Sequence, residues 1–317
     1  KMIIEQNMDG KIEAYNSQSG AIFKVSIPIL YRGKMKNLYI FILILFCFTN
    51  LCASEKMTLG LDTKNLYGTK EIAAIGSEIF INQMEKKKYG AHFAAKLYDN
   101  EKDLIEDFKN KKTHFINIDF ITFFENKDEL NKIFSNKMII NKSNSLLEQY
   151  YIIKNKNSNF TLENFNTKEI YFDHRMALTW YKSIVLKQKS KINPKKFKKV
   201  KKSNKLIFNV FFDSNVISLV SKSLFDDMSE LNPQIKNNIV IVYKSEQIFV
   251  DSIGLSRKDI NPKFELIIKK MKYDIKQKKE NIDALDFVNV NSFKFLENDT
   301  ELEKLEQFLE EYYLLIE

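Results

Sequence analysis

Cysteine is scarce in this 317-residue chain, and the position of its two cysteines is more informative than their number. Cys47 and Cys52 both lie in one apolar segment near the amino terminus, so the sequence after residue 54 contains none. This absence excludes a disulfide framework and a cysteine-based zinc site from the remainder of the chain.

Histidines and catalytic motifs are also sparse. His92, His114 and His174 lack the short spacings of a metal site. The sequence has no P-loop and no glycine-rich dinucleotide turn, and it offers no nucleophilic cysteine after residue 54. Acidic pairs carry little information in a chain with 29% charged residues. We therefore expect a protein that is not an enzyme and that uses no cofactor and no metal.

One long apolar run, residues 38–51 (LYIFILILFCFTNL), follows a basic flank formed by Lys34 and Lys36. Small residues and a polar start follow it at residues 52–55 (CASE), which completes the pattern of a bacterial-type signal peptide beginning at Met35. The run is shorter than the roughly 20 residues that span a bilayer. We interpret residues 35–54 as a signal peptide; an uncleaved membrane anchor and a buried core helix are the alternatives.

Both the signal and the anchor place the following residues outside the cytoplasm, because the basic residues before the run should stay inside. The expected localisation is therefore periplasmic, either free or membrane-anchored.

Basic residues are in excess after residue 54, with 44 Lys and Arg against 38 Asp and Glu. Much of the excess lies in residues 187–205 (KQKSKINPKKFKKVKKSNK), a run that invites a nucleic-acid hypothesis. The run holds few aromatic residues and the signal directs it out of the cell, so we interpret it as a solvated surface and expect no nucleic-acid partner. A mildly cationic cleft that attracts anionic ligands is the alternative.

Short apolar segments alternate with amphipathic ones from residue 57 onward, as is typical of an α/β fold with largely parallel sheets. We expect strands at residues 57–62, 91–98, 114–118, 145–153, 169–173, 217–220 and 239–243, the last of them buried. Helices are expected at residues 69–86, 101–110, 175–187, 224–230, 261–278 and 300–315. The last helix carries one apolar stripe, formed by Leu302, Leu305, Leu309 and Tyr312. Trp180 is expected in the core.

Two successive α/β units of this size predict two lobes with a ligand cleft between them. We place lobe 1 at residues 55–150, lobe 2 at 151–243, and a return to lobe 1 followed by C-terminal helices at 244–317. Open α/β sheets bind ligands beyond the carboxyl ends of their strands, near helix N-termini.

In lobe 1 that rule selects two loops. Tyr67, Gly68 and Thr69 precede the first helix and could offer a backbone and hydroxyl cradle, with ordinary turn and cap chemistry as the alternative. Asp119 and Phe120 end the third strand and could supply an acceptor and an apolar wall. Helix capping by Asp119 is the alternative.

In lobe 2 the equivalent loop holds Asp173, His174 and Arg175. Arg175 could pair with a ligand carboxylate or phosphate, and His174 could make binding depend on pH. The alternative is an Asp cap with two exposed neighbours. Ser245, where the chain returns toward lobe 1, is expected to be a hinge or cleft residue.

A family resemblance lies in the segment from Phe211 and Phe212 through Val220, in residues 224–234 (LFDDMSELNPQ), and in Lys244-Ser245. These segments resemble the phosphate/phosphonate ABC-transporter substrate-binding proteins, and the similarity extends over about residues 57–313. It implies a two-lobed periplasmic binding protein type II fold that closes on a small, anionic or polar ligand. The implied partners are an ABC permease or a sensor histidine kinase.

The chain departs from that family pattern at two places. Residues 213–216 (DSNV) replace a turn that often holds Gly and Asp, and Asp173-His174-Arg175 replaces a helix start rich in Ser and Thr. A carboxylate there would repel a phosphonate, so the resemblance does not supply the identity of the ligand.

Residues 3–29 resemble the end of a sensor histidine kinase ATPase domain, through the helix end IIEQ, the Gly10-Lys11-Ile12 turn and a last strand near Pro28. The asparagine-bearing helix and the Asp-x-Gly-x-Gly loop of that family are absent, so residues 1–34 are interpreted as a remnant without kinase activity. An unrelated two-stranded extension is the alternative. The resemblance leaves open two uses of the exported domain: solute capture for transport, or a sensor component of a two-component system.

Overall fold

The computed structural model describes residues 11–17, 20–26, 56–63, 74–78, 81–82, 92–141, 143–163, 168–276 and 292–316. The chain separates into two compact units, Lys1–Ser54 and Glu55–Glu317. In the first unit, β1 (Lys11–Ser17) and β2 (Gly20–Ser26) form an antiparallel hairpin in which Ser17 lies opposite Gly20. The turn at Gly10-Lys11-Ile12 and the last strand expected from the resemblance of residues 3–29 correspond to these two strands. Residues 35–54 lie outside the described residues, and no described helix has the length and apolarity needed to cross a membrane.

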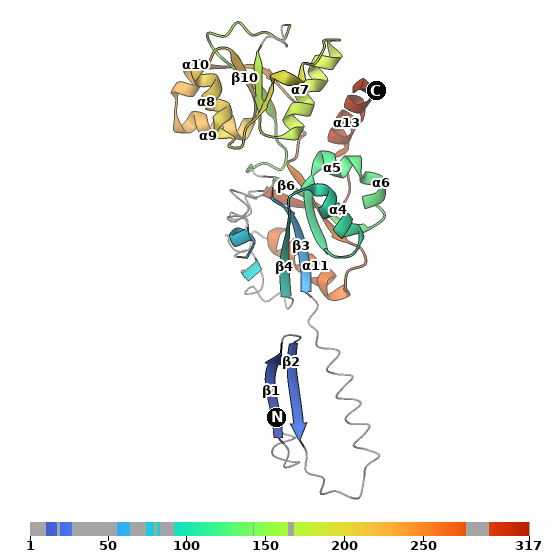
Figure 1. Ribbon diagram of the computed structural model, residues 1–317. Coiled ribbons are helices and arrows are strands. Elements are labelled where there is room, and N and C mark those ends of the chain that lie inside the picture. The colour runs from blue at the N-terminus through green and yellow to red at the C-terminus, as the bar shows by residue number, and fades with distance from the viewer. Residues whose placement is uncertain are drawn as a thin grey trace, which may run out of the picture. The chain divides into compact units, whose positions relative to one another are not determined.

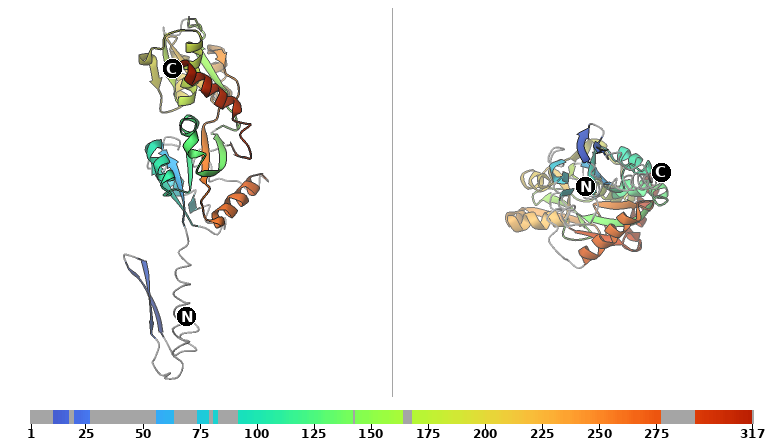
Figure 2. Two further views of the ribbon diagram at one scale, coloured as in Figure 1. Left: turned by 90° about the vertical axis from the view of Figure 1, so that its right-hand side faces the viewer. Right: turned by 90° about the horizontal axis from the view of Figure 1, so that it is seen from below.

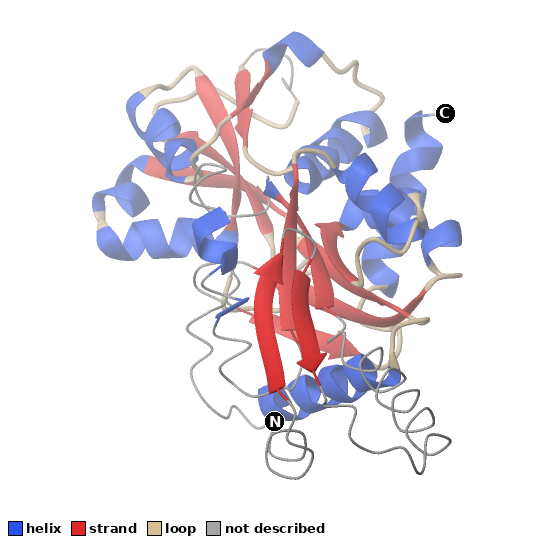
Figure 3. Cartoon of the chain, turned by 60° about the horizontal axis from the view of Figure 1, so that its bottom comes forward, coloured by secondary structure: helices blue, strands red, loops and turns tan. Residues whose placement is uncertain are grey.

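The second unit contains two separate mixed sheets with helices on their flanks (Figures 1 and 3). The first sheet has the strand order β13-β6-β12-β5-β3-β4, and we call it with its helices lobe 1. Its strands are β3 (Lys56–Asp62), β4 (His92–Tyr98), β5 (Phe115–Asp119), β6 (Phe134–Asn141), β12 (Ser252–Arg257) and β13 (Ser292–Leu296). Its helices are α4 (Glu101–Lys109), α5 (Phe120–Glu125), α6 (Lys127–Leu130) and α11 (Pro262–Lys276).

The second sheet has the order β11-β7-β10-β8-β9 and forms lobe 2 with its helices. Its strands are β7 (Tyr150–Asn155), β8 (Glu169–Phe172), β9 (Phe197–Lys199), β10 (Val216–Ser221) and β11 (Ile239–Lys244). Its helices are α7 (Arg175–Lys187), the 3-10 turn η2 (Pro194–Lys196), α8 (Asn204–Phe212), α9 (Lys222–Leu231) and α10 (Gln234–Asn238). Leu206, Ile207 and Val210 of α8 are fully buried in a cluster that also contains Phe225 of α9 and Ile235 of α10.

The sheets are mixed, which corrects the expectation of largely parallel sheets. In lobe 1, β3 is parallel to β4 and β5, but β12 is antiparallel to both β5 and β6. In lobe 2, β7 is antiparallel to β10 and β11. Two of the reversed strands, β7 and β12, enter their lobe from the other one, while β13 is also antiparallel to β6. A strand that enters in this way needs no crossover helix, so the parallel pattern is broken there.

Two segment predictions also need correction. Residues 145–147 form a bend and Glu148 makes only an isolated bridge to Phe249, so the strand expected at 145–153 starts at Tyr150. The strand at 239–243 is not buried as expected. It is an edge strand, and Val240 and Tyr243 are exposed.

The chain passes between the lobes through segments that include residues 143–149 and 245–251, and these two segments are bonded to each other. Glu148 N donates to Phe249 O at 2.7 Å, and Phe249 N donates to Glu148 O at 3.1 Å. Asn141, fully buried at the end of β6, accepts a bond from Asp251 N at 2.7 Å. The two connections therefore form one short two-stranded hinge rather than two independent linkers.

The last helix, α13 (Glu303–Ile316), contacts both lobes. Its predicted apolar stripe is confirmed, since Leu302, Leu305 and Leu309 are fully buried and Tyr312 is nearly so. Lys127 of lobe 1 donates to Glu306 at 2.5 Å, while Lys187 of lobe 2 donates to Glu311 at 2.8 Å. Figures 1 and 2 show α13, in dark red, beside α7.

Candidate functional site

The carboxyl ends of β5 and β8 each lead directly into a helix. Asp119 ends β5 and is followed by α5, while Asp173 and His174 separate β8 from α7. These two loops belong to different lobes, yet the charge of Arg175, the first residue of α7, lowers the pKa of Asp119. Arg175 also pairs with Glu125 at the other end of α5, so the first turn of α7 lies against a helix of the other lobe.

Asp119 caps α5, as its alternative interpretation predicted. Its Oδ1 accepts from Ile121 N at 2.8 Å and Thr122 N at 3.4 Å, and its own N donates to Glu101 Oε1 at 2.7 Å. Its Oδ2 has no hydrogen-bond partner among the described residues. The pKa of Asp119 is raised to about 6, first by burial and then by the charge of Glu101, against the lowering effect of the two N–H groups and Arg175. The carboxylate is thus held in a place that disfavours its own charge.

The N-terminus of α7 has no side-chain cap. His174, rather than Asp173, occupies the N-cap position, with φ −105° and ψ 141°, and its imidazole makes no capping bond. Its Nε2 lies 3.7 Å from Asp173 Oδ2. A 13-residue helix with uncapped N–H groups carries partial positive charge at this end, and such an end attracts oxyanions.

Arg175 makes an ion pair across the two lobes. Its Nη2 donates to Glu125 Oε1 at the end of α5, and Tyr313 OH of α13 donates to the same oxygen at 2.6 Å. The Arg175 side chain is 48% exposed, so it is still accessible to solvent beside this ion pair. Glu125 therefore joins lobe 1, lobe 2 and α13 at one point, which we call the Glu125 junction.

Tyr150 lies at the start of β7, where the hinge enters lobe 2, and its side chain is almost completely buried. Burial raises its pKa well above the ordinary value, and the charges of Asp251, Asp173, Glu148 and Asp119 add to this effect. These carboxylates come from both lobes and from the hinge. Negative charges from both lobes and from the hinge therefore act together on the Tyr150 hydroxyl.

Ser245 holds the hinge together. Its N donates to Tyr150 O at 2.8 Å, its Oγ accepts from Tyr150 N at 2.8 Å, and the same hydroxyl donates to Glu246 O at 2.7 Å. The hydroxyl is buried and fully used by these bonds. Ser245 thus lies where the chain leaves lobe 2, and its role as a hinge or cleft residue stays a prediction.

The structure describes some of the other predicted residues and leaves others out. Phe120 is fully buried in lobe 1 and packs against Phe123 with ring centroids 5.8 Å apart. Tyr67, Gly68 and Thr69 lie outside the described residues. Trp180 is buried, as expected for a core residue, and stacks on Tyr150 and Tyr243 at 6.2 and 6.0 Å.

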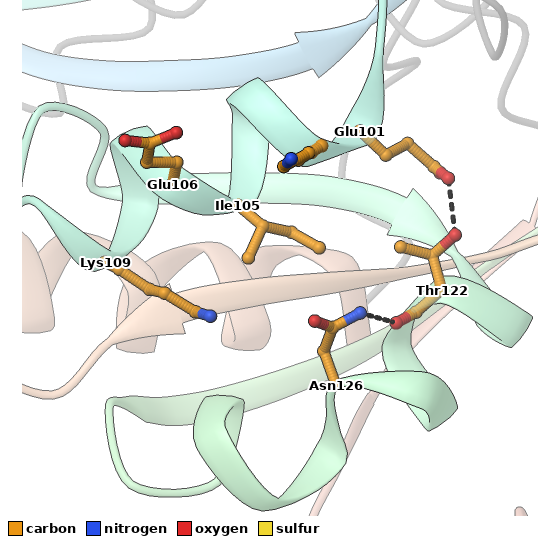
Figure 4. Close-up of a pocket in the computed structure, with 7 residues that line it drawn as sticks. Glu101, Ile105, Glu106, Lys109, Thr122 and Asn126 are labelled. Atoms are coloured by element: carbon orange, nitrogen blue, oxygen red, sulfur yellow. Dashed lines mark hydrogen bonds between the residues drawn. The ribbon is translucent and has the colours of Figure 1, made fainter.

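A separate open groove of about 470 Å³ runs between α4 and the α5–α6 segment (Figure 4). Ile105 forms its apolar floor, and Thr122 and Asn126 line one side, with Asn126 Nδ2 donating to Thr122 O at 2.8 Å. Glu101, at one end of the groove, accepts from both Thr122 Oγ1 and Asp119 N. Among the described residues, no cluster of His, Cys, Asp and Glu is placed to hold a metal ion.

Glu125, Tyr150 and Tyr313 were not predicted from the sequence. Glu125 lies five residues after the start of its helix and Tyr313 lies near the end of the chain, so neither follows a strand end. Tyr150 sits inside a strand, where an aromatic residue reads as core. Only the packing of α13 and the hinge brings these side chains to the loops that follow β5 and β8.

Solved structures of known proteins share the fold described above. No curated protein shows significant similarity to the chain. A solved binding-protein component of an ABC phosphonate transporter from Pseudomonas aeruginosa matches with a TM-score of 0.58 at 13% identity, over 83% of this chain and 88% of the other. A Xanthomonas citri protein bound to ATP matches with a TM-score of 0.58 at 11% identity, over 83% and 100% of the two chains.

A third structure, a Prochlorococcus marinus protein in complex with methylphosphonate, has a TM-score of 0.55 at 13% identity, over 82% and 99% of the two chains. These likenesses confirm the two-lobed periplasmic binding protein type II fold. A family model described as "ABC transporter, phosphonate, periplasmic substrate-binding protein" matches residues 76–300. The chain therefore belongs to the family of periplasmic substrate-binding proteins of ABC phosphonate transporters.

Proposed function

We propose that residues 55–317 capture a small zwitterionic solute, with one oxyanion and one ammonium group, in a cleft between the lobes. The observation that carries this proposal is the uncapped N-terminus of α7, whose first residue Arg175 pairs with Glu125 at the far end of the helix that the partly buried Asp119 caps. The α7 N-terminus suits an oxyanion and the Asp119 carboxylate suits a cation. A ligand with both charges would satisfy the two lobes at once.

The oxyanion would lie at the α7 N-terminus, where the N–H groups, His174 and the accessible side chain of Arg175 can surround it. A phosphonate fits this position, and a methylphosphonate complex is known in a protein of the same fold. Lobe 2 supports this choice. Residues 150–244 hold 18 Lys and Arg against seven Asp and Glu, a net charge of +11 (18 − 7), in a chain whose total is +9.

The ammonium group would lie toward Asp119 and Asp173. A ligand with only negative charge would meet both carboxylates at close range, and such repulsion costs several kcal/mol in a partly buried site. A cation there would instead relieve the burial that now raises the pKa of Asp119.

Membership of the family implies a periplasmic location and delivery of the ligand to an ABC permease. The sensory alternative, a partner histidine kinase, remains a hypothesis that rests on residues 3–29 alone. Membrane contact through residues 35–54 likewise remains a hypothesis.

The test is a thermal-shift and calorimetry screen on purified residues 55–317 with three matched compounds: 2-aminoethylphosphonate, ethylphosphonate and ethylamine. We expect 2-aminoethylphosphonate to bind at least tenfold more tightly than either single-charge compound, because each of those leaves one half of the site unpaired. Methylphosphonate, phosphate, alkylsulfonates and amino acids complete the screen.

Asp173→Asn should weaken 2-aminoethylphosphonate binding roughly tenfold or more and leave ethylphosphonate unchanged or slightly stronger. Asp213→Asn is the matched control, because Asp213 lies at the exposed end of α8 in the same lobe. Stronger binding of ethylphosphonate than of the amine-bearing compound would disprove the cation half of the proposal. No stabilisation by any compound would count against the binding function itself.

A further inference from the structure

Lobe 2 carries an exposed aromatic and basic surface that takes no part in the proposed ligand site. Phe208 and Phe212 of α8 are 39% and 80% exposed, although their neighbours on the other side of the helix are fully buried. Lys201, Lys202 and Lys205 precede and begin the same helix and are also exposed. We call these five residues the α8 patch.

Helical geometry places the patch along one line. Lys205, Phe208 and Phe212 are three and four residues apart, so they share the outer face of α8, opposite Leu206, Ile207 and Val210. Lys202 lies one turn earlier, where its carbonyl accepts from Lys205 N at 3.0 Å. The inner face of α8 thus fills the core, while its outer face presents Lys205, Phe208 and Phe212, and Lys201 and Lys202 lie just before the helix.

The two exposed rings form a single aromatic surface rather than scattered apolar contacts. The Phe208 and Phe212 rings stack with centroids 6.5 Å apart and an interplanar angle of 24°. Phe211 supports Phe212 edge-on at 5.0 Å. A paired aromatic surface of this kind marks an interaction site more often than isolated apolar residues do.

The charge around the patch indicates what it binds. Asp213 is the one acidic residue in residues 201–213, against three lysines. Exposed Lys195, Lys198 and Lys199 precede the patch, and lobe 2 as a whole has a net charge of +11 (18 − 7). Lysines beside exposed phenylalanines are the combination that binds anionic lipid, because the ammonium groups meet phosphates while the rings enter the headgroup boundary.

We propose that the α8 patch docks lobe 2 on an anionic lipid bilayer. A binding protein that delivers its ligand to a membrane permease works at such a surface. Docking through one lobe would leave lobe 1 free to move about the hinge. It would also restrict the search for a permease to two dimensions.

The test measures binding of residues 55–317 to vesicles of phosphatidylethanolamine and phosphatidylglycerol, against vesicles of phosphatidylcholine, by co-sedimentation. We expect binding to the anionic vesicles only, with affinity that falls steeply as salt rises. Changing Lys201, Lys202 and Lys205 together to Gln should weaken it roughly 100-fold, at about fivefold for each lysine. The double change Phe208→Ser and Phe212→Ser should weaken it roughly tenfold or more.

Leu231→Ser is the matched control, since Leu231 is 81% exposed in the same lobe but lies on α9, outside the patch. It should leave vesicle binding unchanged. Energy transfer from Trp180 to a dansyl headgroup probe, measured as sensitised dansyl emission that appears only on docking, gives a second readout. Ligand binding measured in the same variants checks that lobe 2 is still folded.

Three outcomes would overturn the proposal: equal binding to neutral and anionic vesicles, full binding by either α8 variant, or loss of binding in the Leu231→Ser control. Self-association of the chain that the phenylalanine variant abolishes, with no vesicle binding, would assign the patch to a second copy instead. Binding of duplex DNA at the same salt that competes with the vesicles would assign it to general charge attraction.

Discussion

At the scale of single residues, Asp119 combines two roles that oppose each other. Its Oδ1 caps α5, which requires an acceptor, while its burial beside Glu101 disfavours the charged form. Asn caps helices about as well as Asp does and carries no charge. The substitution Asp119→Asn therefore separates the cap from the charge.

The pKa of about 6 for Asp119 in the folded protein lies above the ordinary value of 3.8. Between those two values the folded protein binds more protons than the unfolded chain, so the free energy of unfolding falls as pH rises through about 4 to 6. We expect Asp119→Asn to have the same melting temperature as the parent below about pH 4. Above about pH 6 the variant should be more stable, by at most about 3 kcal/mol.

Melting curves between pH 3.5 and pH 8 check this expectation. A difference between the two proteins that stays constant across that range would show that the cap, and not the charge, decides the effect. The same variant should bind 2-aminoethylphosphonate more weakly at pH 8, because the cation would lose its partner. Stability and binding would then change in opposite directions.

At the scale of single elements, the N-terminus of α7 lacks the stabilising side-chain cap, and this leaves its first N–H groups open. A Ser at the His174 position would accept from the first turn and add about 1 kcal/mol to the free energy of unfolding. Its hydroxyl would occupy the N–H groups that the oxyanion is proposed to use. We expect His174→Ser to melt at a higher temperature and to bind the phosphonate ligand less tightly.

Thermal denaturation and calorimetry on one preparation test this pair of effects. Asn100→Ala provides the opposite control, since Asn100 Oδ1 caps α4 by accepting from Asp103 N at 2.9 Å. It should lower stability by about 1 kcal/mol and leave ligand affinity unchanged. If His174→Ser binds the ligand as tightly as the parent does, the α7 N-terminus is not part of the site.

The segments with the clearest periodicity were predicted, but β6, β12 and β13 of lobe 1 and α8 of lobe 2 were not expected at all. The helix at 175–187 was predicted to its last residue because Arg175 to Lys187 has an apolar face and follows a short strand. The strand expected from Ser145 was wrong for its first five residues, since an apolar run that forms a hinge has the same pattern as one that enters a sheet. The edge position of β11 could not be foreseen either, because pairing partners distant in sequence decide it.

The sequence could predict the part of the candidate site that each lobe contributes next to its own strands, but not the contacts between the lobes. The strand-end rule found Asp119 and His174, which lie next to their own strands. It could not find Glu125 or Tyr313, because these side chains reach the site through contacts between α5, α7 and α13. Such contacts depend on tertiary packing that no local pattern encodes.

At the scale of the whole molecule, the Glu125 junction ties together three parts that must separate if the lobes open. Glu125→Gln removes the charge that Arg175 and Tyr313 share. The ion pair is partly exposed, so its loss should change stability by only about 0–1 kcal/mol. A change of this size is nevertheless enough to shift a balance between open and closed lobes about fivefold.

Small-angle X-ray scattering of the ligand-free protein should therefore show a larger radius of gyration for Glu125→Gln. Glu129→Gln is the matched control, because Glu129 pairs with Lys109 inside lobe 1. It should leave the radius unchanged. An unchanged radius for Glu125→Gln as well would mean that α13 holds the lobes through its apolar stripe alone.

The strand order of lobe 1 has a consequence for how the chain reaches its native state. β12 lies between β5 and β6 in that sheet, yet all of lobe 2 separates it from them in the sequence. During synthesis or passage through a membrane, lobe 2 can complete its own sheet while lobe 1 still lacks this inner strand. Closing such a long loop is slow, and until it closes β5 and β6 have unpaired edges open to other chains. Lobe 1 is therefore the part of the molecule that most needs protection from aggregation while it waits for its last strands.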